Sequence, residues 1–146
     1  MTRAIQLEGV DKSFFSKEGR VDALSSVSFD VGQHEFVAVV GASGCGKSTL
    51  LRIIGGLMDK TAGNVFINGE PVTGPVTETG IVFQTPVLLP WRSVRRNIEL
   101  QLDVRGLERE RYRDTIDELL ALVGLTGFGD RKPFELSGGM QQRAAL

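Results

Sequence analysis

The sequence of 146 residues holds one cysteine, one histidine and no long apolar run. A single cysteine, Cys45, cannot form an internal disulfide, which fits a reducing compartment. The single histidine, His34, has no cluster of ligand residues beside it and is better explained as a turn residue than as a metal ligand. The apolar stretch "TLLRIIGGLM" is interrupted by Arg52 and two glycines, so it is too short to span a membrane. These absences exclude a disulfide scaffold, a histidine-based metal centre and a membrane span.

An excess of charge of one sign is also lacking. The formal net charge is -1 and 41% of the residues are hydrophobic, which is typical of an ordinary globular domain. Seven arginines lie between residues 92 and 113, but four acids are interleaved with them, so we interpret this segment as a solvated helix face. The N-terminus alternates polar and apolar residues and has no signal-peptide core. We expect a cytoplasmic protein without a nucleic-acid partner.

Alternating segments in the first half predict antiparallel strands. "AIQLEGV" and "ALSSVSFDV" place apolar residues at every second position, which is typical of half-buried strands, and the polar "SKEGR" lies between them. A further short strand in "GNVFINGEPVTGP" ends at Asn68-Gly69, a pair suited to a tight hairpin. The first half therefore contains an antiparallel sheet.

Two other segments predict a parallel core. "EFVAVVG", residues 35–41, is an almost unbroken apolar run, as expected of a strand buried on both faces. "TGIVFQ", residues 79–84, is a second candidate core strand, and it ends in the polar Gln84. Strand ends of this kind are where α/β proteins place ligand contacts.

The stretch "GASGCGKST", residues 41–49, matches G-x-x-x-x-G-K-[ST] and joins the first core strand to a helix. Glycines let the backbone curl until its N–H groups point at phosphate oxygens, and the positive end of the helix faces the same anion. Lys47 is placed to reach the β and γ phosphates, and Ser48 to hold Mg²⁺. We interpret Cys45 as a small loop residue. The helix itself repeats apolar residues at helical spacing: Leu50, Ile53, Ile54 and Leu57.

The second half has helical patterns. Ser93 can cap a helix, and one face of that helix carries Val94, Ile98 and Leu102. A longer apolar stripe follows and ends at Gly124: Tyr112, Ile116, Leu119, Leu120 and Val123. "LSGGMQQRAAL", residues 136–146, opens one more helix at Ser137. The predicted second half is a helical subdomain.

The phosphate loop, the glutamine after "GIVF" and "LSGGMQ", in this order, resemble the ATP-binding subunits of ABC transporters. The strings "VGASGCGKSTLLRIIGGL" and "GIVFQTPVLLPWRSVRRNI" are similar to the importer branch for nitrate, taurine and aliphatic sulfonates. The resemblance implies an α/β fold: a P-loop NTPase core with an antiparallel β subdomain and a helical subdomain, truncated before the Walker B strand. Residues 1–84 would be the β and P-loop core of this single incomplete domain, and residues 85–146 the helical subdomain.

The resemblance also implies roles for single residues. Phe14 corresponds to the aromatic residue that stacks on adenine, with Phe15 as the alternative, and Gln84 contacts the metal and couples the nucleotide to the permease. ATP and Mg²⁺ are the implied ligands, with Ser48 and Gln84 at the metal. The remaining implied ATP contacts are Gly41, Ser43, Gly44, Cys45, Gly46, Lys47, Ser48 and Thr49 in the phosphate loop. The signature residues, which contact ATP held by a second subunit, are Ser137, Gly138, Gly139 and Gln141.

The implied partners are membrane permease subunits, which would contact residues 85–97, a second ATP-binding subunit arranged head to tail, and indirectly a solute-binding protein. The subunit would then lie on the inner face of the cell membrane. The Walker B aspartate, the catalytic glutamate and the switch histidine of the family have no counterpart, and Asp130 and Glu135 are poor substitutes because no apolar strand precedes them. Without a neighbouring strand, residues 35–41 and 79–84 would expose apolar surface, and we expect poor stability or aggregation.

Three other functions remain open at this point. One is a non-hydrolysing module that binds nucleotide or docks on a permease, and another is a soluble ATPase of the same family that acts on nucleic acids or ribosomes. A P-loop kinase is the third, although such an enzyme has no use for the LSGG element.

Overall fold

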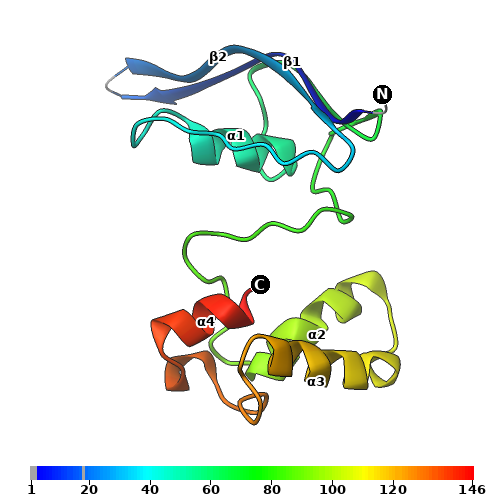
Figure 1. Ribbon diagram of the computed structural model, residues 1–146. Coiled ribbons are helices and arrows are strands. Elements are labelled where there is room, and N and C mark those ends of the chain that lie inside the picture. The colour runs from blue at the N-terminus through cyan, green and yellow to red at the C-terminus, as the bar shows by residue number, and fades with distance from the viewer. Residues whose placement is uncertain (1–2, 18) are drawn as a thin grey trace. The chain divides into compact units, whose positions relative to one another are not determined.

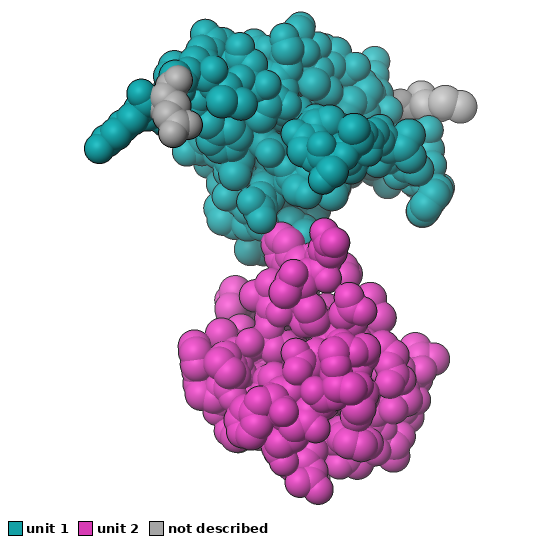
Figure 2. Space-filling view, turned by 90° about the vertical axis from the view of Figure 1, so that its left-hand side faces the viewer, with its two compact units in different colours: residues 1–81 teal, residues 82–146 magenta. Residues whose placement is uncertain are grey.

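The computed structural model describes residues 3–17 and 19–146, and it consists of two compact units, residues 1–81 and 82–146. Figure 2 shows the two units in different colours. Each unit has its own apolar core. None of the helices in the described ranges is long and apolar enough to cross a membrane.

The first unit contains a four-stranded antiparallel sheet in the order β2-β1-β3-β4. Its strands are β1 (Arg3–Ser16), β2 (Gly19–Gly32), β3 (Ala62–Ile67) and β4 (Glu70–Pro71). The long β1–β2 hairpin confirms the prediction from the two alternating segments. Asn68 and Gly69 both have positive φ, as a tight two-residue turn between β3 and β4 requires.

Helix α1 (Lys47–Ile54) packs along one face of this sheet (Figure 1). Leu50 and Ile53 of α1 are buried against side chains of three strands: Leu7, Val10, Leu24 and Val65. The prediction that Leu57 continues the helical repeat is wrong, because α1 ends at Ile54, and Leu57 is 47% exposed.

The two predicted core strands are absent. Residues 35–40 and 79–83 lie outside every strand and helix of the described ranges, so this part of the prediction is wrong. Phe36 is 93% exposed and Val40 87%, while Val82 is 59% exposed. The physical reason is that a strand buried on both faces needs hydrogen-bonded neighbours, and none of the described strands lies beside either segment. The expectation of exposed apolar surface is confirmed.

The second unit is helical. It contains α2 (Val94–Arg105), the 3₁₀ turn η1 (Arg109–Tyr112), α3 (Arg113–Leu122), the 3₁₀ turn η2 (Pro133–Glu135) and α4 (Gly138–Ala144). The Ser93 hydroxyl accepts a hydrogen bond from the Arg96 amide, which confirms the predicted cap of α2. Val94, Ile116 and Leu120 lie in the core as predicted, but Leu119 is 47% exposed, so its assignment to the buried stripe is wrong.

The arginine-rich segment is more than a solvated face. Asp103 accepts hydrogen bonds from Arg109 at 2.7 Å and from Arg92 at 3.5 Å, so one carboxylate connects η1, α2 and the residues before α2. The Arg109 guanidinium in particular holds the pKa of Asp103 below its ordinary value. Glu99 is 8% exposed and pairs with Arg96 at 2.9 Å. The interpretation of these acids as freely solvated is therefore wrong at Glu99.

Candidate functional site

The phosphate loop, residues 41–49, closes around the side chain of Lys47. The Lys47 ammonium donates hydrogen bonds to the carbonyl oxygens of Gly41 at 2.8 Å and Ala42 at 2.6 Å. The Cys45 Sγ atom lies 3.6 Å from the same nitrogen. An anion would be bound by backbone N–H groups of the loop, and Lys47 would leave these two carbonyl oxygens to reach it.

Two glycines make this curvature feasible. Gly44 has φ of 79° and Gly46 φ of 97°, a region that residues with a Cβ rarely adopt. At Gly46 there is also no room, because a Cβ would collide with the Ala23 carbonyl oxygen of β2 and lie 2.9 Å from Leu24. The start of α1 is therefore seated directly against the hairpin.

The loop offers a donor set that fits a polyphosphate. The first N–H groups of α1 have no acceptor within the helix, and together they form the positive end of the helix dipole. Ser48, at the second helical position, is exposed, and so is Ser43 in the loop, while Thr49 is half-buried. Lys47 can exchange its two carbonyl partners for phosphate oxygens. These donors suit the phosphate groups of ATP.

For Mg²⁺ the fit rests on few protein ligands. Within the described residues there is no group of three histidine, cysteine, aspartate or glutamate side chains that could hold a metal. Mg²⁺ bound to a nucleotide takes most of its ligands from phosphates and water, and the Ser48 hydroxyl would supply one protein ligand. Ser48 belongs to the first unit and Gln84 to the second.

The aromatic candidates lie near the tip of the β1–β2 hairpin. Phe14 is 42% exposed, and the Lys12 ammonium lies 5.1 Å from the centre of its ring. Phe15 is 75% exposed, with the Arg20 guanidinium 6.0 Å from its ring. Both rings are accessible to a base, and Phe14 is the more firmly held of the two.

Gln84 is exposed, and its backbone carbonyl accepts a hydrogen bond from the Gln142 side chain at 3.3 Å. Further along the same segment, Val87 and Trp91 are each 69% exposed. The Trp91 carbonyl accepts a hydrogen bond from the Lys132 ammonium at 2.6 Å. The segment 85–97 thus presents apolar side chains on an anchored backbone.

The LSGG element begins α4. The Ser137 hydroxyl accepts a hydrogen bond from the Met140 amide at 3.4 Å, and Gly138 and Gly139 are exposed with open space where a Cβ would stand. The Gln141 side chain donates to the carbonyl oxygens of Pro133 at 2.8 Å and Leu136 at 3.2 Å. Gln141 thereby ties the loop before α4 to the helix.

Glu135 is engaged in the same loop. Its carboxylate accepts hydrogen bonds from the Lys132 amide at 2.6 Å and the Arg131 guanidinium at 3.1 Å, and the first of these in particular lowers its pKa. A carboxylate tied in this way closes the turn before α4.

Sequence reasoning missed the residues that support Phe14. Ser13, next to it, is 6% exposed, and its hydroxyl donates to the Asp22 carboxylate at 2.6 Å. The contact joins residues of different strands through an irregularity of the hairpin, and no local pattern indicates it.

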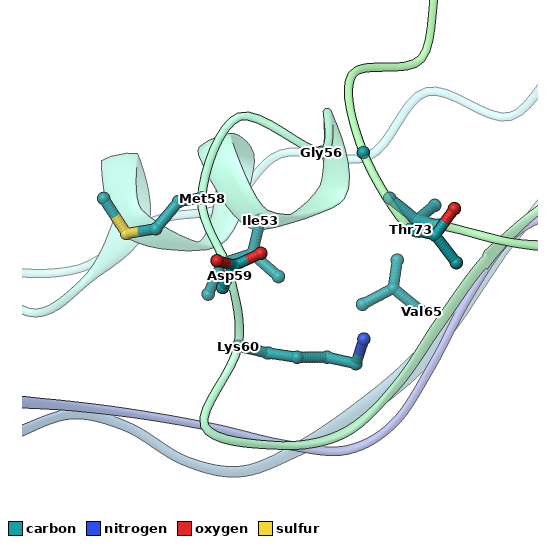
Figure 3. Close-up of a pocket in the computed structure, with 9 residues that line it drawn as sticks. Ile53, Gly56, Met58, Asp59, Lys60, Val65 and Thr73 are labelled. Atoms are coloured by element: carbon teal, nitrogen blue, oxygen red, sulfur yellow. The ribbon is translucent and has the colours of Figure 1, made fainter.

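The first unit also has a cavity of about 290 Å³, at the C-terminal end of α1. Figure 3 shows the Lys60 side chain extending into this space from the segment after α1, towards the strand that carries Val65. The phosphate loop is at the other end of α1, and none of its residues lines the cavity. The cavity is therefore separate from the candidate phosphate site.

Comparison with known proteins gives consistent matches. The family model described as ABC transporter matches residues 24–146. The nitrate import ATP-binding protein NrtD of Synechocystis sp. is 43% identical over 142 residues, which cover 97% of this chain and 53% of that protein. The taurine import ATP-binding protein TauB of Jannaschia sp. is 46% identical over 128 residues, which cover 88% of this chain and 48% of that protein.

Among solved structures, the ATP-binding cassette MJ0796, a dimer in a post-hydrolysis state bound to ADP and Pi, matches with a TM-score of 0.87. It is 34% identical, and the match covers 97% of this chain and 66% of the cassette. The chain spans about half the length of the curated relatives that it matches. Because the family model matches most of its length and a solved ATP-binding cassette has the same fold, the chain belongs to the ABC transporter family, as an ATP-binding cassette.

Proposed function

We propose that this chain acts as the ATP-binding subunit of an ABC importer, in which ATP binding and hydrolysis drive solute uptake through a membrane permease. The observation that carries the proposal is the phosphate loop, closed around the Lys47 ammonium and seated against β2 at Gly46. The relatives named as nitrate and taurine import ATP-binding proteins support an importer.

In this proposal the N–H groups of the loop and the Lys47 ammonium bind the triphosphate, and Ser48 holds Mg²⁺, which neutralises charge on the phosphates. Phe14 stacks on the base. A positioned cation and a row of amide dipoles stabilise negative charge most where water is excluded, so the loop binds a triphosphate more tightly than a monophosphate.

The second unit supplies two contacts with partners. Val87 and Trp91, exposed on the segment 85–97, would contact the permease, and a solute-binding protein would act on that permease from the other side. Ser137, Gly138 and Gly139, exposed at the start of α4, would contact the ATP of a second subunit arranged head to tail. The dimeric cassette among the solved structures supports a second subunit as a partner. Contact with a permease would put the protein on the inner face of the cell membrane.

A non-hydrolysing nucleotide-binding module is the second candidate. It is favoured by Glu135, whose carboxylate is engaged by the Lys132 amide and the Arg131 guanidinium and so closes a turn. Turnover of ATP by the chain excludes this candidate, whereas binding without turnover supports it.

The experiment is a titration of the chain with ATP and Mg²⁺ by isothermal calorimetry, together with release of inorganic phosphate. Lys47→Ala is the test variant, because it removes the only side-chain cation that the loop encloses, and Lys60→Ala is the matched control at the other end of α1. We expect saturable binding that Lys47→Ala weakens at least tenfold and Lys60→Ala leaves unchanged. Equal affinity for ATP in the wild type and Lys47→Ala would refute the proposal.

A further inference from the structure

The β1–β2 hairpin contains a bulge next to Phe14. Lys12 of β1 lies opposite Leu24 of β2, whereas Ser13 lies opposite Asp22, so one residue of β2, Ala23, has no counterpart in β1. Bulges of this kind shift the pairing by one residue and redirect side chains. Without the bulge, Asp22 would lie opposite Phe14.

The bulge determines which side chains share a face. Residues opposite each other in an antiparallel pair point to the same face, so Ser13 and Asp22 meet on one face and Phe14 and Val21 on the other. Lys12 is opposite Leu24, which belongs to the core against α1. Because residues two apart on a strand also share a face, Phe14 points to the α1 side, which agrees with the Lys12 ammonium lying 5.1 Å from its ring centre.

Ser13 is fixed from two directions. Its hydroxyl donates to the Asp22 carboxylate at 2.6 Å, and its amide donates to the Thr61 hydroxyl at 2.9 Å. The same Asp22 oxygen accepts from the Arg20 guanidinium at 2.6 Å. The backbone that carries Phe14 is therefore held by side chains of β2 and of the residue before β3.

The bulge residue is also the point where the phosphate loop meets the hairpin. The Ala23 carbonyl lies so close to Gly46 that no Cβ fits between them. The irregular residue Ala23 thus connects the backbone that orients Phe14 with Gly46, the N-cap residue of α1.

We propose that Asp22 is a positioning residue for the nucleotide base: by holding Ser13 across the bulge, it fixes the Phe14 ring at a set place relative to the phosphate loop. This inference rests on the proposed function, since it takes ATP as the ligand and Phe14 as the ring that stacks on the base. Asp22 acts through Ser13 and does not touch the nucleotide.

The test compares ATP with inorganic tripolyphosphate, which engages the phosphate loop but has no base. Variants of the 146-residue chain are Phe14→Ala, Asp22→Ala, Ser13→Ala and the double variant Ser13→Ala/Asp22→Ala. A further variant, Asp22→Asn, keeps an oxygen acceptor for Ser13. The matched control is Asp30→Ala, because Asp30 is also an aspartate of β2 in an exposed pair with an arginine, Arg3, at 3.2 Å. Circular dichroism checks that each variant is folded.

We expect Phe14→Ala to weaken ATP binding about 5- to 140-fold, the range for losing one base–aromatic stack, and Asp22→Ala about 3- to 10-fold, because a displaced ring keeps part of the stack. Ser13→Ala should match Asp22→Ala, and the double variant should be no weaker than either, because both remove the same contact. Tripolyphosphate affinity should stay constant in all of these variants. Asp22→Asn and Asp30→Ala should bind ATP as the wild type does.

Two results would overturn the inference while leaving the proposed function intact. One is wild-type affinity for ATP in Asp22→Ala, and the other is an equal loss of ATP and tripolyphosphate binding, which indicates a purely structural role. A wild-type chain that binds neither ligand refutes the proposed function itself, so the two failures are distinguishable.

Discussion

The phosphate loop needs glycine for two reasons, a positive φ and a lack of space for a Cβ, and Gly44→Ala and Gly46→Ala separate these two reasons. Both positions have positive φ, 97° and 79°, so each substitution strains the backbone by about 1–2 kcal/mol. Only at Gly46 would the new methyl group meet other atoms, the Ala23 carbonyl oxygen and the Leu24 side chain, whereas at Gly44 no atom lies within 4 Å. Displacing packed atoms costs a further ~1–3 kcal/mol. We therefore expect Gly46→Ala to destabilise the first unit by about 2–5 kcal/mol and Gly44→Ala by about 1–2 kcal/mol.

The measurement is urea unfolding followed by circular dichroism at low protein concentration. With a slope of about 1–3 kcal/mol/M, the unfolding midpoint of Gly46→Ala should lie about 1 M below that of Gly44→Ala. Equal midpoints for the two variants would refute the reasoning, because they would show that the loop is not pressed against Ala23.

Three further predictions concern the rest of the molecule. Ser93→Ala removes the cap of α2 and should lower the unfolding free energy of the second unit by about 1 kcal/mol, measured by urea unfolding; no change would contradict the role of the cap. Phe36→Ser should reduce aggregation and dye binding without a loss of stability, because this ring is 93% exposed; an unfolded variant would contradict its exposure. The lowered pKa of Asp103 means that its stabilising charge is complete above its ordinary value of 3.8 and is lost as the pH falls below it through the native pKa. Asp103→Asn should remove this part of the acid sensitivity in a pH titration of stability, and an unaltered titration would argue against the ion pair with Arg109.

Local patterns predicted the elements that local contacts form. The alternation of β1 and β2, the Asn68-Gly69 turn and the Ser93 cap each depend on neighbouring residues, and the structure contains all three. The apolar residues of 35–41 have the same strand propensity, but a buried strand is completed by partners from elsewhere, and the described strands offer none. At residues 35–41 the strand propensity alone predicted the wrong structure, because no described strand pairs with this segment.

The candidate site divides in the same way. The spacing of Gly44, Gly46 and Lys47 is a local property, and it predicted a glycine turn before a helix, which the structure contains, with positive φ at both glycines. Phosphate binding by this loop stays a prediction. The bond between Ser13 and Asp22 depends on a one-residue shift between two strands, which neither strand encodes by itself. The exposure of Leu57 and Leu119 likewise reflects where helix α1 ends and which face of α3 is covered.

The central claim is that residues 41–49 bind the phosphates of ATP. Hydrogen exchange of the backbone amides, followed by mass spectrometry with and without ATP and Mg²⁺, tests it directly, since these amides would become hydrogen-bonded to phosphate oxygens. The account predicts slower exchange in residues 41–49 with ATP and no such protection in Lys47→Ala. Unchanged exchange of this loop at saturating ATP would contradict it.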